Sequence, residues 1–305
     1  MYKSYFDISE EVQQALKNHQ PVIALESTLI SHGLPYPKNL DVANSSLEAV
    51  RSSGSVPATI AIINGRIKVG LNDDDMQILA TNNTVEKASK HNLLIALNNK
   101  SHAATTVAST IYLASQIGIK FFATGGIGGA HLDSENTFDI SADLNQLSKT
   151  FIFVICSGAK SILDLDKTHE ILETLGVARI GFKTDFMPGF WYYQTDKKVD
   201  YNFNQIDNLA NYLKICNEVH QTSSTLIFNP VPREKAIKKE LIEEWIRISI
   251  EKSKTKSITG KELTPYLIKE INLLSENKTL EANMALIINN ALLAGQLAVQ
   301  YFKKI

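Results

Sequence analysis

The stretch "FIFVICSGAKSILDL", residues 151–165, decides the fold class of this 305-residue chain. Its first five residues are apolar, and the β-branched and aromatic side chains among them predict a strand that is buried on both faces. Small residues follow, and the pattern over 166–176 predicts a helix that ends at Gly176. A buried strand that passes directly into a helix is typical of layered α/β domains. Lys160 then lies at the carboxyl end of the strand, the edge at which open α/β sheets bind their ligands.

The same alternation of apolar runs and helical patterns extends over most of the chain. Residues 57–71 predict two strands joined by Asn64 and Gly65, the preferred pair for a type I′ turn. We therefore expect a layered α/β domain with a mixed sheet. Further strands are expected at 21–29, 92–98, 120–126, 177–182 and 224–230, and helices that end in glycine at 39–54 and 104–118.

The carboxyl-terminal part of the chain reads as helix, with segments expected at 234–254, 260–275 and 279–304. No repeat, linker or low-complexity block divides the sequence, which favours a single domain over 1–305. The first residues are charged and amphipathic, and no run of about 18 uncharged apolar residues occurs, so neither a signal peptide nor a membrane segment is expected.

The composition argues against several classes of partner. Lys plus Arg total 31 against 32 for Asp plus Glu, and the charges are interspersed, so we expect neither a nucleic acid nor an anionic membrane as partner. Two cysteines, Cys156 and Cys216, cannot build a disulfide framework. Their scarcity suits a reducing compartment, and the cytoplasm is the expected location.

Lys160 and Glu26 are the two candidate catalytic residues. Partial shielding of the Lys160 amine by Gly158 and Ala159 would disfavour its ammonium form and free the lone pair to attack a carbonyl or to act as a base, whereas the alternative is a surface lysine at a helix start. Glu26 follows the strand expected at 21–29, where burial would raise the pKa of its carboxyl and suit it to general acid work near neutral pH. The alternative for Glu26 is a structural carboxylate that caps nearby amides.

The segment 123–144 combines glycines with charged residues. Four glycines after a predicted strand can expose backbone amides to a ligand and adopt conformations closed to other residues, although their spacing is not that of a dinucleotide-binding fingerprint. The polar residues after these glycines are His131, Asp133, Asp139 and Asp143. One or two of their carboxylates, together with water, would suit Mg²⁺ or Mn²⁺ better than a closed zinc site. Alternatively, Asp139 or Ser141 caps a helix that begins near Ala142.

Two weaker signals lie elsewhere. Lys87 is expected on a short helix, and Thr105 and Thr106 precede helix-start amides of the kind that hold phosphate. Asn283 and Asn290 are seven residues apart in the last predicted helix and therefore share one face. There they could contact a ligand or tie helices together.

Several of these segments together resemble the pseudouridine-5′-phosphate glycosidase family, also called indigoidine synthase A-like. They occur in the family's order from about Leu25 to Ala298, and include "ALESTLISHGLPYP", "VPATIAIINGRIKVGL", "VEKAS", "ATTVAST", "FFATGGIGGAH", "FDISADL", "SGAKSILDLDKTHEILETLGV" and "NMALIINNALLAGQLA". The resemblance implies a three-layer α/β/α sandwich around the mixed sheet, a homotrimer and a requirement for Mn²⁺. It also implies reversible cleavage of pseudouridine 5′-phosphate to uracil and ribose 5-phosphate.

The resemblance further implies roles for individual residues. Lys160 would be the nucleophile that forms an imine with C1′ of the sugar, and Glu26 the proton donor. Asp139 in "FDISADL" would hold the metal. The positions that match the family's substrate-binding residues are Lys87, Val107, Thr124, His131, Ser141, Ala142, Asp143 and Asn283.

The chain departs from the family pattern at Ala104, where glycine is usual, and over "FKTDFMPGFW", residues 182–191, in which Lys183 stands where a small residue is usual. The first departure could reshape the phosphate end of the pocket and the second a pocket wall. Two other functions are kept as alternatives: a noncatalytic sugar-phosphate sensor, and an imine-forming enzyme that acts on another sugar phosphate. The pairing of Glu26 with Lys160 argues against the sensor, because a binding module needs no imine-forming amine beside an acid.

Overall fold

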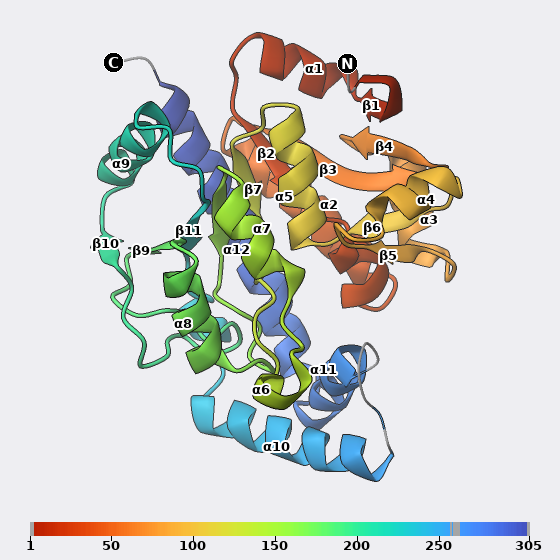
Figure 1. The fold of residues 1–305 in the computed structure, drawn as a ribbon, viewed down its shortest axis with the longest axis vertical. Helices are drawn as coiled ribbons and strands as arrows, with labels where there is room; N and C mark the ends of the chain where they lie inside the picture. Colours follow the sequence, from red (N-terminus) through yellow and green to blue (C-terminus); the bar gives the residue numbers. More distant parts are fainter. Residues whose placement is uncertain (1–2, 257, 259–262, 304–305) are drawn as a thin grey trace.

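The computed structural model describes residues 3–256, 258 and 263–303. Within this part of the chain eleven strands form one mixed sheet in the order β1-β4-β3-β2-β7-β8-β11-β9-β10, with β6 on β3 and β5 on β6. Helices cover both faces, so the predicted three-layer α/β/α sandwich is confirmed (Figure 1). The strands are β1 Phe6–Ile8, β2 Val22–Leu25, β3 Val56–Ile63, β4 Arg66–Val69, β5 Glu86–Ala88, β6 Ala103–Thr105, β7 Phe121–Ala123, β8 Phe153–Cys156, β9 Ala178–Phe182, β10 Tyr201–Phe203 and β11 Thr225–Phe228.

The central strands are apolar at every position because both of their faces are buried. In β2, Val22 and Ala24 join the core on one side of the sheet, and Ile23 and Leu25 join the core on the other. Successive side chains of a strand point to opposite faces, so a continuous apolar run serves two helical layers at once. The strands from β2 through β7, β8 and β11 to β9 and β10 are parallel to their neighbours.

The helices divide between the two faces. α5, α7 and α8 lie in front of the sheet as drawn in Figure 1, and α12 runs behind it. Apolar side chains of α9, with some of those of α2 and α12, share one core with the sheet, and those of α1, α5, α7 and α8 share another. Val42 of α2 and Leu286 of α12 belong to the second core. The helices are α1 Glu10–Lys17, α2 Lys38–Ser52, α3 Asp73–Thr81, α4 Leu93–Asn98, α5 Val107–Gln116, α6 Ser134–Thr137, α7 Ala142–Lys149, α8 Leu165–Thr174, α9 Ile206–Glu218, α10 Lys239–Thr255, α11 Leu263–Leu274 and α12 Lys278–Phe302.

The turn predicted at Asn64 and Gly65 is confirmed. β3 and β4 pair antiparallel, and both turn residues have positive φ, 50° and 69°, as a type I′ turn requires. The predicted glycine ends of α2, α5 and α8 are also confirmed, since Gly54, Gly118 and Gly176 lie just beyond these helices with φ of 89°, 84° and 66°.

Three local predictions were wrong. Residues 92–98 form helix α4 instead of a strand: Leu93 and Ala96 are buried on one face, whereas Leu94 and Ile95 are exposed. A short apolar run does not distinguish a strand from a helix by itself. Lys87 lies in strand β5 instead of a helix, because the backbone of 86–88 pairs with β6. The same pairing makes 103–105 a strand, so the helix expected from 104 begins at 107.

The carboxyl-terminal helices follow the prediction except at their starts. The first begins at Lys239, after a single 3₁₀ turn at Arg233–Lys235. The other two predicted helices, over 260–275 and 279–304, correspond to α11 and α12. Residues 260–262 and 304 of these predictions lie outside the described part of the chain. Among the described helices, one is long and apolar enough to cross a membrane, namely α12. However, 56% of its most apolar 18-residue stretch is buried inside the fold, where α12 packs against the sheet and α2.

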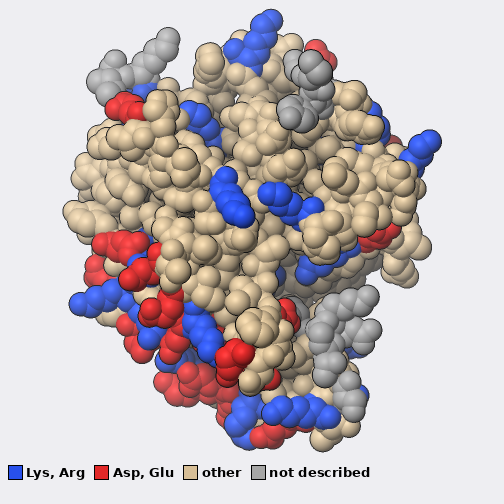
Figure 2. Space-filling view, viewed as in Figure 1, with Lys and Arg blue, Asp and Glu red and all other residues tan. Residues whose placement is uncertain are grey.

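Charged side chains gather at one end of the face shown in Figure 2, over α8 and α10. Both signs are mixed there, in ion pairs that include Lys197 with Asp166 and Arg247 with Glu251. The carboxyl edge of the parallel strands is a separate region, and the candidate site lies there.

Candidate active site

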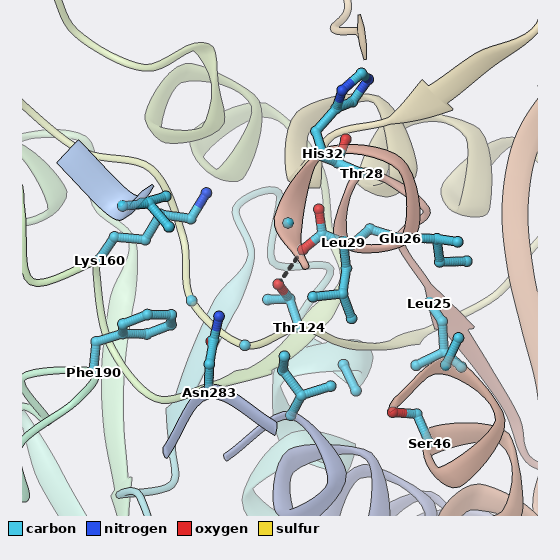
Figure 3. Close-up of a pocket in the computed structure, with 18 of the residues that line it drawn as sticks. Leu25, Glu26, Thr28, Leu29, His32, Ser46, Thr124, Lys160, Phe190 and Asn283 are labelled. Atoms are coloured by element: carbon cyan, nitrogen blue, oxygen red, sulfur yellow. Dashed lines mark hydrogen bonds between the residues drawn. The ribbon is translucent and has the colours of Figure 1, made fainter. Parts of the chain in front are cut away.

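The parallel strands bring the two candidate catalytic residues to one edge of the sheet. Glu26 directly follows β2, and Lys160 follows β8 by four residues. β7 lies between these strands, with Ala123 in register with both Leu25 and Ile155. Figure 3 shows the Lys160 amine and the Glu26 carboxyl on opposite sides of one hollow, with Thr124 and Asn283 below.

This hollow is a cavity of about 190 Å³. Five residues singled out from the sequence line it: Glu26, Lys87, Thr124, Lys160 and Asn283. The sequence reading missed other lining residues, among them His32, Ser46, Phe190, Trp191, Pro265 and Ile268. His32 lies within the motif "ALESTLISHGLPYP", and Phe190 and Trp191 lie within the departing segment 182–191, but nothing local in the sequence distinguishes these three from packing residues.

Burial raises the pKa of the Glu26 carboxyl above its ordinary value, as the sequence predicted. The neighbouring Lys160 charge and a hydrogen bond donated by the Thr124 hydroxyl oppose this shift without cancelling it. Glu26 is in contact with the cavity and otherwise enclosed by protein. A raised pKa is the property that a carboxyl group needs to act as a general acid.

Small residues shape the loop that carries Lys160. The Lys160 amide donates to the Ile127 carbonyl at 3.2 Å, which joins this loop to the glycine-rich segment. Gly158 has φ of 87°, and a Cβ there would lie 2.1 Å from the Pro188 carbonyl oxygen. Glycine is required at 158 on both grounds, and the loop is thereby held against residues 188–192.

Lys87 is the second amine that lines the cavity. Partial burial, followed by the nearby Lys160 charge, lowers the pKa of Lys87, whereas Asp143 and Glu26 act in the opposite direction. Two lysine amines therefore share this region with the Asp143 carboxylate and with the Glu26 carboxyl, whose pKa is raised. The two lysines can contact an anionic ligand.

Four other predicted site residues form a cluster that adjoins the cavity without lining it. Val107 begins α5, and Ser141, Ala142 and Asp143 begin α7, which packs beside α5. The buried Asp143 carboxylate accepts from the amides of Ala108 at 2.9 Å and Gly128 at 2.8 Å. Its charge raises the pKa of Glu26 and opposes the lowering of the pKa of Lys87. The Ser141 hydroxyl accepts from the Asp143 amide at 3.2 Å, which confirms the alternative that Ser141 caps this helix.

His131 and Asp139 lie farther out, in the loop between the glycines and α7. The His131 amide donates to the Asp139 carbonyl at 3.0 Å, and the His131 Nδ1 lies 3.9 Å from an Asp139 carboxylate oxygen. The Asp139 side chain is 48% exposed. Among the described residues, no three His, Cys, Asp or Glu side chains come together as a metal site.

The glycines of 125–129 serve close packing instead of unusual backbone angles, since positive φ is recorded at none of them. A Cβ on Gly128 would lie 2.2 Å from the Ser141 hydroxyl, and one on Gly129 would lie 2.2 Å from the Thr168 hydroxyl. A Cβ on Gly126 would meet the Phe190 ring at 2.7 Å. The segment lets α7, α8 and the cavity wall approach the backbone closely.

The two asparagines of α12 have different surroundings. The buried Asn290 amide donates to the Thr124 carbonyl at 2.8 Å and accepts from the Asn229 amide at 3.0 Å, so it ties α12 to the strand ends. Asn283 lines the cavity, and its Oδ1 is buried with no partner among the described residues. Asn290 therefore ties structural elements together, and Asn283 is open to a ligand.

Ala104 and Lys183 both lie outside the cavity, although the departing segment 182–191 reaches it. Ala104 is buried in β6 between β3 and β5. Lys183 is exposed, with its amine over the Phe182 ring. The wall is instead formed by Phe190 and Trp191 of the same segment.

A family model described as "Indigoidine synthase A like protein" matches residues 11–300. The chain belongs to this family. The indigoidine synthase A-like relatives include a protein of Caldanaerobacter subterraneus subsp. tengcongensis, 46% identical over 299 residues, with 98% of this chain and 97% of that one covered. A protein of Staphylococcus aureus is 45% identical over 297 residues, with 97% of each chain covered. Both relatives are named pseudouridine-5′-phosphate glycosidase.

Two solved structures share the fold over nearly the whole chain. The prealnumycin C-glycosynthase AlnA, solved in complex with ribulose 5-phosphate, superposes with a TM-score of 0.92 at 33% identity and covers 98% of both chains. An indigoidine synthase A-like protein of Thermotoga maritima superposes with a TM-score of 0.89 at 30% identity and covers 99% of both chains.

Proposed function

We propose that this protein is a pseudouridine-5′-phosphate glycosidase, which reversibly cleaves pseudouridine 5′-phosphate to uracil and ribose 5-phosphate. The single observation that carries the proposal is the pairing of the Lys160 amine with the proton-retaining Glu26 carboxyl across one cavity. The names of the relatives support the same substrate. The sugar phosphate bound to AlnA supports a ligand of that class in this fold.

The chemistry explains why a lysine is needed. The base and sugar of pseudouridine are joined by a carbon-carbon bond, so protonation of a glycosidic oxygen or nitrogen cannot release the base. A pair of carboxylates of the kind used by ordinary glycosidases is therefore insufficient. An amine on C1′ supplies the missing electron pair, because its nitrogen can form an iminium as the base departs.

The steps assign one role to each catalytic residue. The Nζ of Lys160 attacks C1′ as the C1′–O4′ bond breaks, and the proton that Nζ must lose passes to O4′, which restores the nitrogen lone pair. Glu26 then donates its proton to C5 of the uracil. The C1′–C5 bond breaks with its electron pair left on the base, and the nitrogen lone pair forms the iminium at C1′. Water hydrolyses the iminium and returns ribose 5-phosphate and the free lysine.

The phosphate end of the substrate suits the cationic and amide-rich side of the site. Lys87 supplies a charge, and the starts of α5 and α7 supply backbone amides near Val107 and Ala142. Ser141, Asp143, Thr124 and His131 are proposed to complete the contacts to the substrate. Asp143 would act by holding the amides of Ala108 and Gly128 in place.

Lys160→Ala provides the test of the mechanism. The protein is mixed with pseudouridine 5′-phosphate and Mn²⁺, treated with borohydride, and assayed for released uracil and for a sugar adduct on Lys160 by peptide mass spectrometry. We expect both products from the parent and neither from Lys160→Ala, with turnover lower by at least about 10³-fold. Lys183→Ala is the matched control, because this lysine lies outside the cavity and should retain both products.

Three results would contradict the proposal in different ways. Normal turnover by Lys160→Ala would exclude the imine. Binding of the substrate without turnover by the parent would favour a sugar-phosphate sensor. An adduct with ribulose 5-phosphate or another sugar phosphate, but no uracil from pseudouridine 5′-phosphate, would favour an imine-forming enzyme on a different substrate, which is the alternative that the AlnA complex suggests.

We further propose that the protein binds Mn²⁺ through Asp139. The half-exposed carboxylate, with the His131 imidazole nearby, fits a hard cation that keeps most of its water ligands. When bound, the ion would order water and polar groups around the sugar phosphate.

Asp139→Asn should weaken Mn²⁺ binding by at least about tenfold, measured from the electron paramagnetic resonance signal of free Mn²⁺. Asp133→Asn is the control, and equal affinity in the parent and Asp139→Asn would exclude Asp139 as the ligand.

A homotrimer and a cytoplasmic location complete the proposal. The trimer rests on the family resemblance and on exposed apolar side chains in the loop that carries Asp139, of which Phe138 is 80% exposed. The location rests on the scarcity of cysteine in the sequence. Detection of the native protein in an oxidising compartment would contradict that location.

A further inference from the structure

Strands β2 and β6 occupy the same edge of β3, one after the other, and β4 pairs with the opposite edge. β2 pairs with residues 56–59 of β3 and β6 with residues 61–62, so Ile60 lies at the gap between the two strand ends. Glu26 directly follows β2, and the chain after β6 enters α5 at Val107. The gap therefore separates the proton donor from the end of the site proposed to hold the phosphate.

Two hydroxyl groups close this gap. Ser27 and Thr105 are fully buried, and their hydroxyls donate to the same Ile60 carbonyl at 2.7 Å and 2.6 Å. The Ser27 hydroxyl also accepts from the Thr105 amide at 2.8 Å. We call Ser27, Ile60 and Thr105 the hydroxyl junction. Because its hydroxyls are buried and hydrogen-bonded, the junction holds the end of β2 rigidly against the end of β6.

Two further hydroxyls hold Thr105 in place. The Thr28 hydroxyl donates to the Thr105 carbonyl at 2.8 Å, and the Thr110 hydroxyl donates to the Thr105 hydroxyl at 2.9 Å. The amide, the carbonyl and the hydroxyl of Thr105 are thus each bonded to a side chain of another residue. This leaves the backbone at Thr105 little freedom to move relative to Ser27 and Thr28.

The connection continues from Thr105 to Lys87. Thr105 is in register with Ala88 of β5, and the Ala88 carbonyl accepts from the Thr106 amide at 3.1 Å and from the Ser109 hydroxyl at 2.6 Å. Lys87 precedes Ala88 and lines the cavity. Buried hydrogen bonds and short stretches of chain therefore connect the acid to the cation proposed to contact the phosphate.

We propose that Ser27 and Thr105 are positioning residues for the cleavage step, which set the distance between the Glu26 carboxyl and the phosphate end of the site. This role rests on the proposed function. A substrate that is anchored by its phosphate brings C5 of its base to one place, and proton transfer needs the acid within hydrogen-bond reach of that place. Lys160 belongs to a different loop, after β8, so imine formation should not depend on the junction.

Thr105→Val tests this role, because valine keeps the shape of threonine and removes the hydroxyl. The kcat for cleavage of pseudouridine 5′-phosphate should fall about tenfold with little change in KM, since the acid is misplaced while substrate binding is kept. The borohydride-trapped adduct of ribose 5-phosphate on Lys160 should not change. Thr105→Ser restores the hydroxyl and should regain most of the parent's kcat.

Thr279→Val is the matched control. Thr279 of α12 is buried outside the cavity, and its hydroxyl donates to the Asn272 Oδ1 at 2.6 Å. This variant should lose stability in urea unfolding as Thr105→Val does, but it should keep the parent's kcat. If Thr105→Val does not fold, Ser27→Ala removes the other hydroxyl donor to Ile60 and is measured with the same expectation.

The outcomes separate this role from the proposed function. If the parent releases uracil and Thr105→Val has an unchanged kcat, the role is wrong while the function stands. A loss of kcat that Thr279→Val reproduces, or that Thr105→Ser does not recover, also overturns the role, because lost stability or lost packing then explains it. A parallel loss of the Lys160 adduct would show that the junction does not act through the acid. No uracil from the parent overturns the function, and the role falls with it.

Discussion

At the scale of single residues, the site depends on one carboxyl group that is kept from ionising easily. Glu26 lies at the end of a buried strand, and burial outweighs the favourable charge of Lys160 and the hydroxyl of Thr124. Ordinary glutamate ionises near pH 4, so the shift moves its proton toward the range in which an acid can work at neutral pH.

Glu26→Gln should therefore change both activity and the pH dependence of stability. Turnover of pseudouridine 5′-phosphate should fall about 10²- to 10⁴-fold, because the proton donor is lost. The parent's own cleavage rate should fall as pH rises through the raised pKa of Glu26.

The stability effect of Glu26 has a definite sign. Because the pKa is raised in the folded state, the folded chain binds the proton more tightly, and the parent loses stability as pH rises from the unfolded-state pKa of Glu26 through its folded-state pKa. Glu26→Gln should gain stability relative to the parent over this window, measured by urea unfolding at pH 4.5 and pH 8. The exposed Glu244→Gln is the control. An equal difference at both pH values would contradict the burial of an acid at position 26.

At the scale of secondary-structure elements, α12 joins the strand ends that build the site. Asn290 is fully buried and contacts the loops after three strands: Thr124 after β7, Ser157 after β8 and Asn229 after β11. The position of Thr124 matters because its hydroxyl donates to Glu26. Helix α12 therefore helps to set the distance between the acid and the lysine loop.

Asn290→Ala should lower the free energy of unfolding by about 2–3 kcal/mol, since several buried partners lose their hydrogen bonds. Asn289→Ala is the matched control on the next position of the helix, where one long contact to the Pro230 carbonyl at 3.4 Å is lost, and it should cost less than about 0.5 kcal/mol. If Asn290 also positions the acid, kcat should fall in the Asn290 variant with little change in KM. Equal effects of the two variants would refute this role.

At the scale of the whole molecule, exposed apolar side chains gather in one loop. Leu132, Phe138 and Ile140 are 44%, 80% and 44% exposed, and all three belong to the segment that carries His131 and Asp139. Contiguous apolar surface of this kind is typical of an interface between chains. The arrangement would place a subunit contact beside the candidate metal ligand.

Light scattering should therefore give a mass three times that of the 33.8 kDa chain. Phe138→Ser should shift the mass toward one chain, because it removes the most exposed of these apolar side chains. Tyr201→Ser, another exposed aromatic residue at 62%, is the control and should keep the parent's mass. A single-chain mass for the parent would exclude the trimer.

Much of the fold could be predicted from residues that are neighbours in the sequence. The apolar runs predict β2, β7, β8 and β11, Asn64 and Gly65 predict the hairpin, and three glycines predict the ends of their helices. The strand-end positions of Glu26 and Lys160 follow from the same signals. The error at 92–98 is instructive, since a run of seven residues matches a strand and a helix equally well until its partners are known.

The sequence by itself determined which chemistry the chain carries, because residue type and position at a strand end are local properties. Only the tertiary structure decided what surrounds that chemistry. It places Lys87 and Lys160 at one cavity, leaves Asp139 outside that cavity, and brings Phe190, Trp191 and Asn283 to its wall. The physical reason is that a cavity is bounded by segments far apart in the chain, and its burial, charge and unpaired polar groups arise from their packing and from no single stretch of sequence.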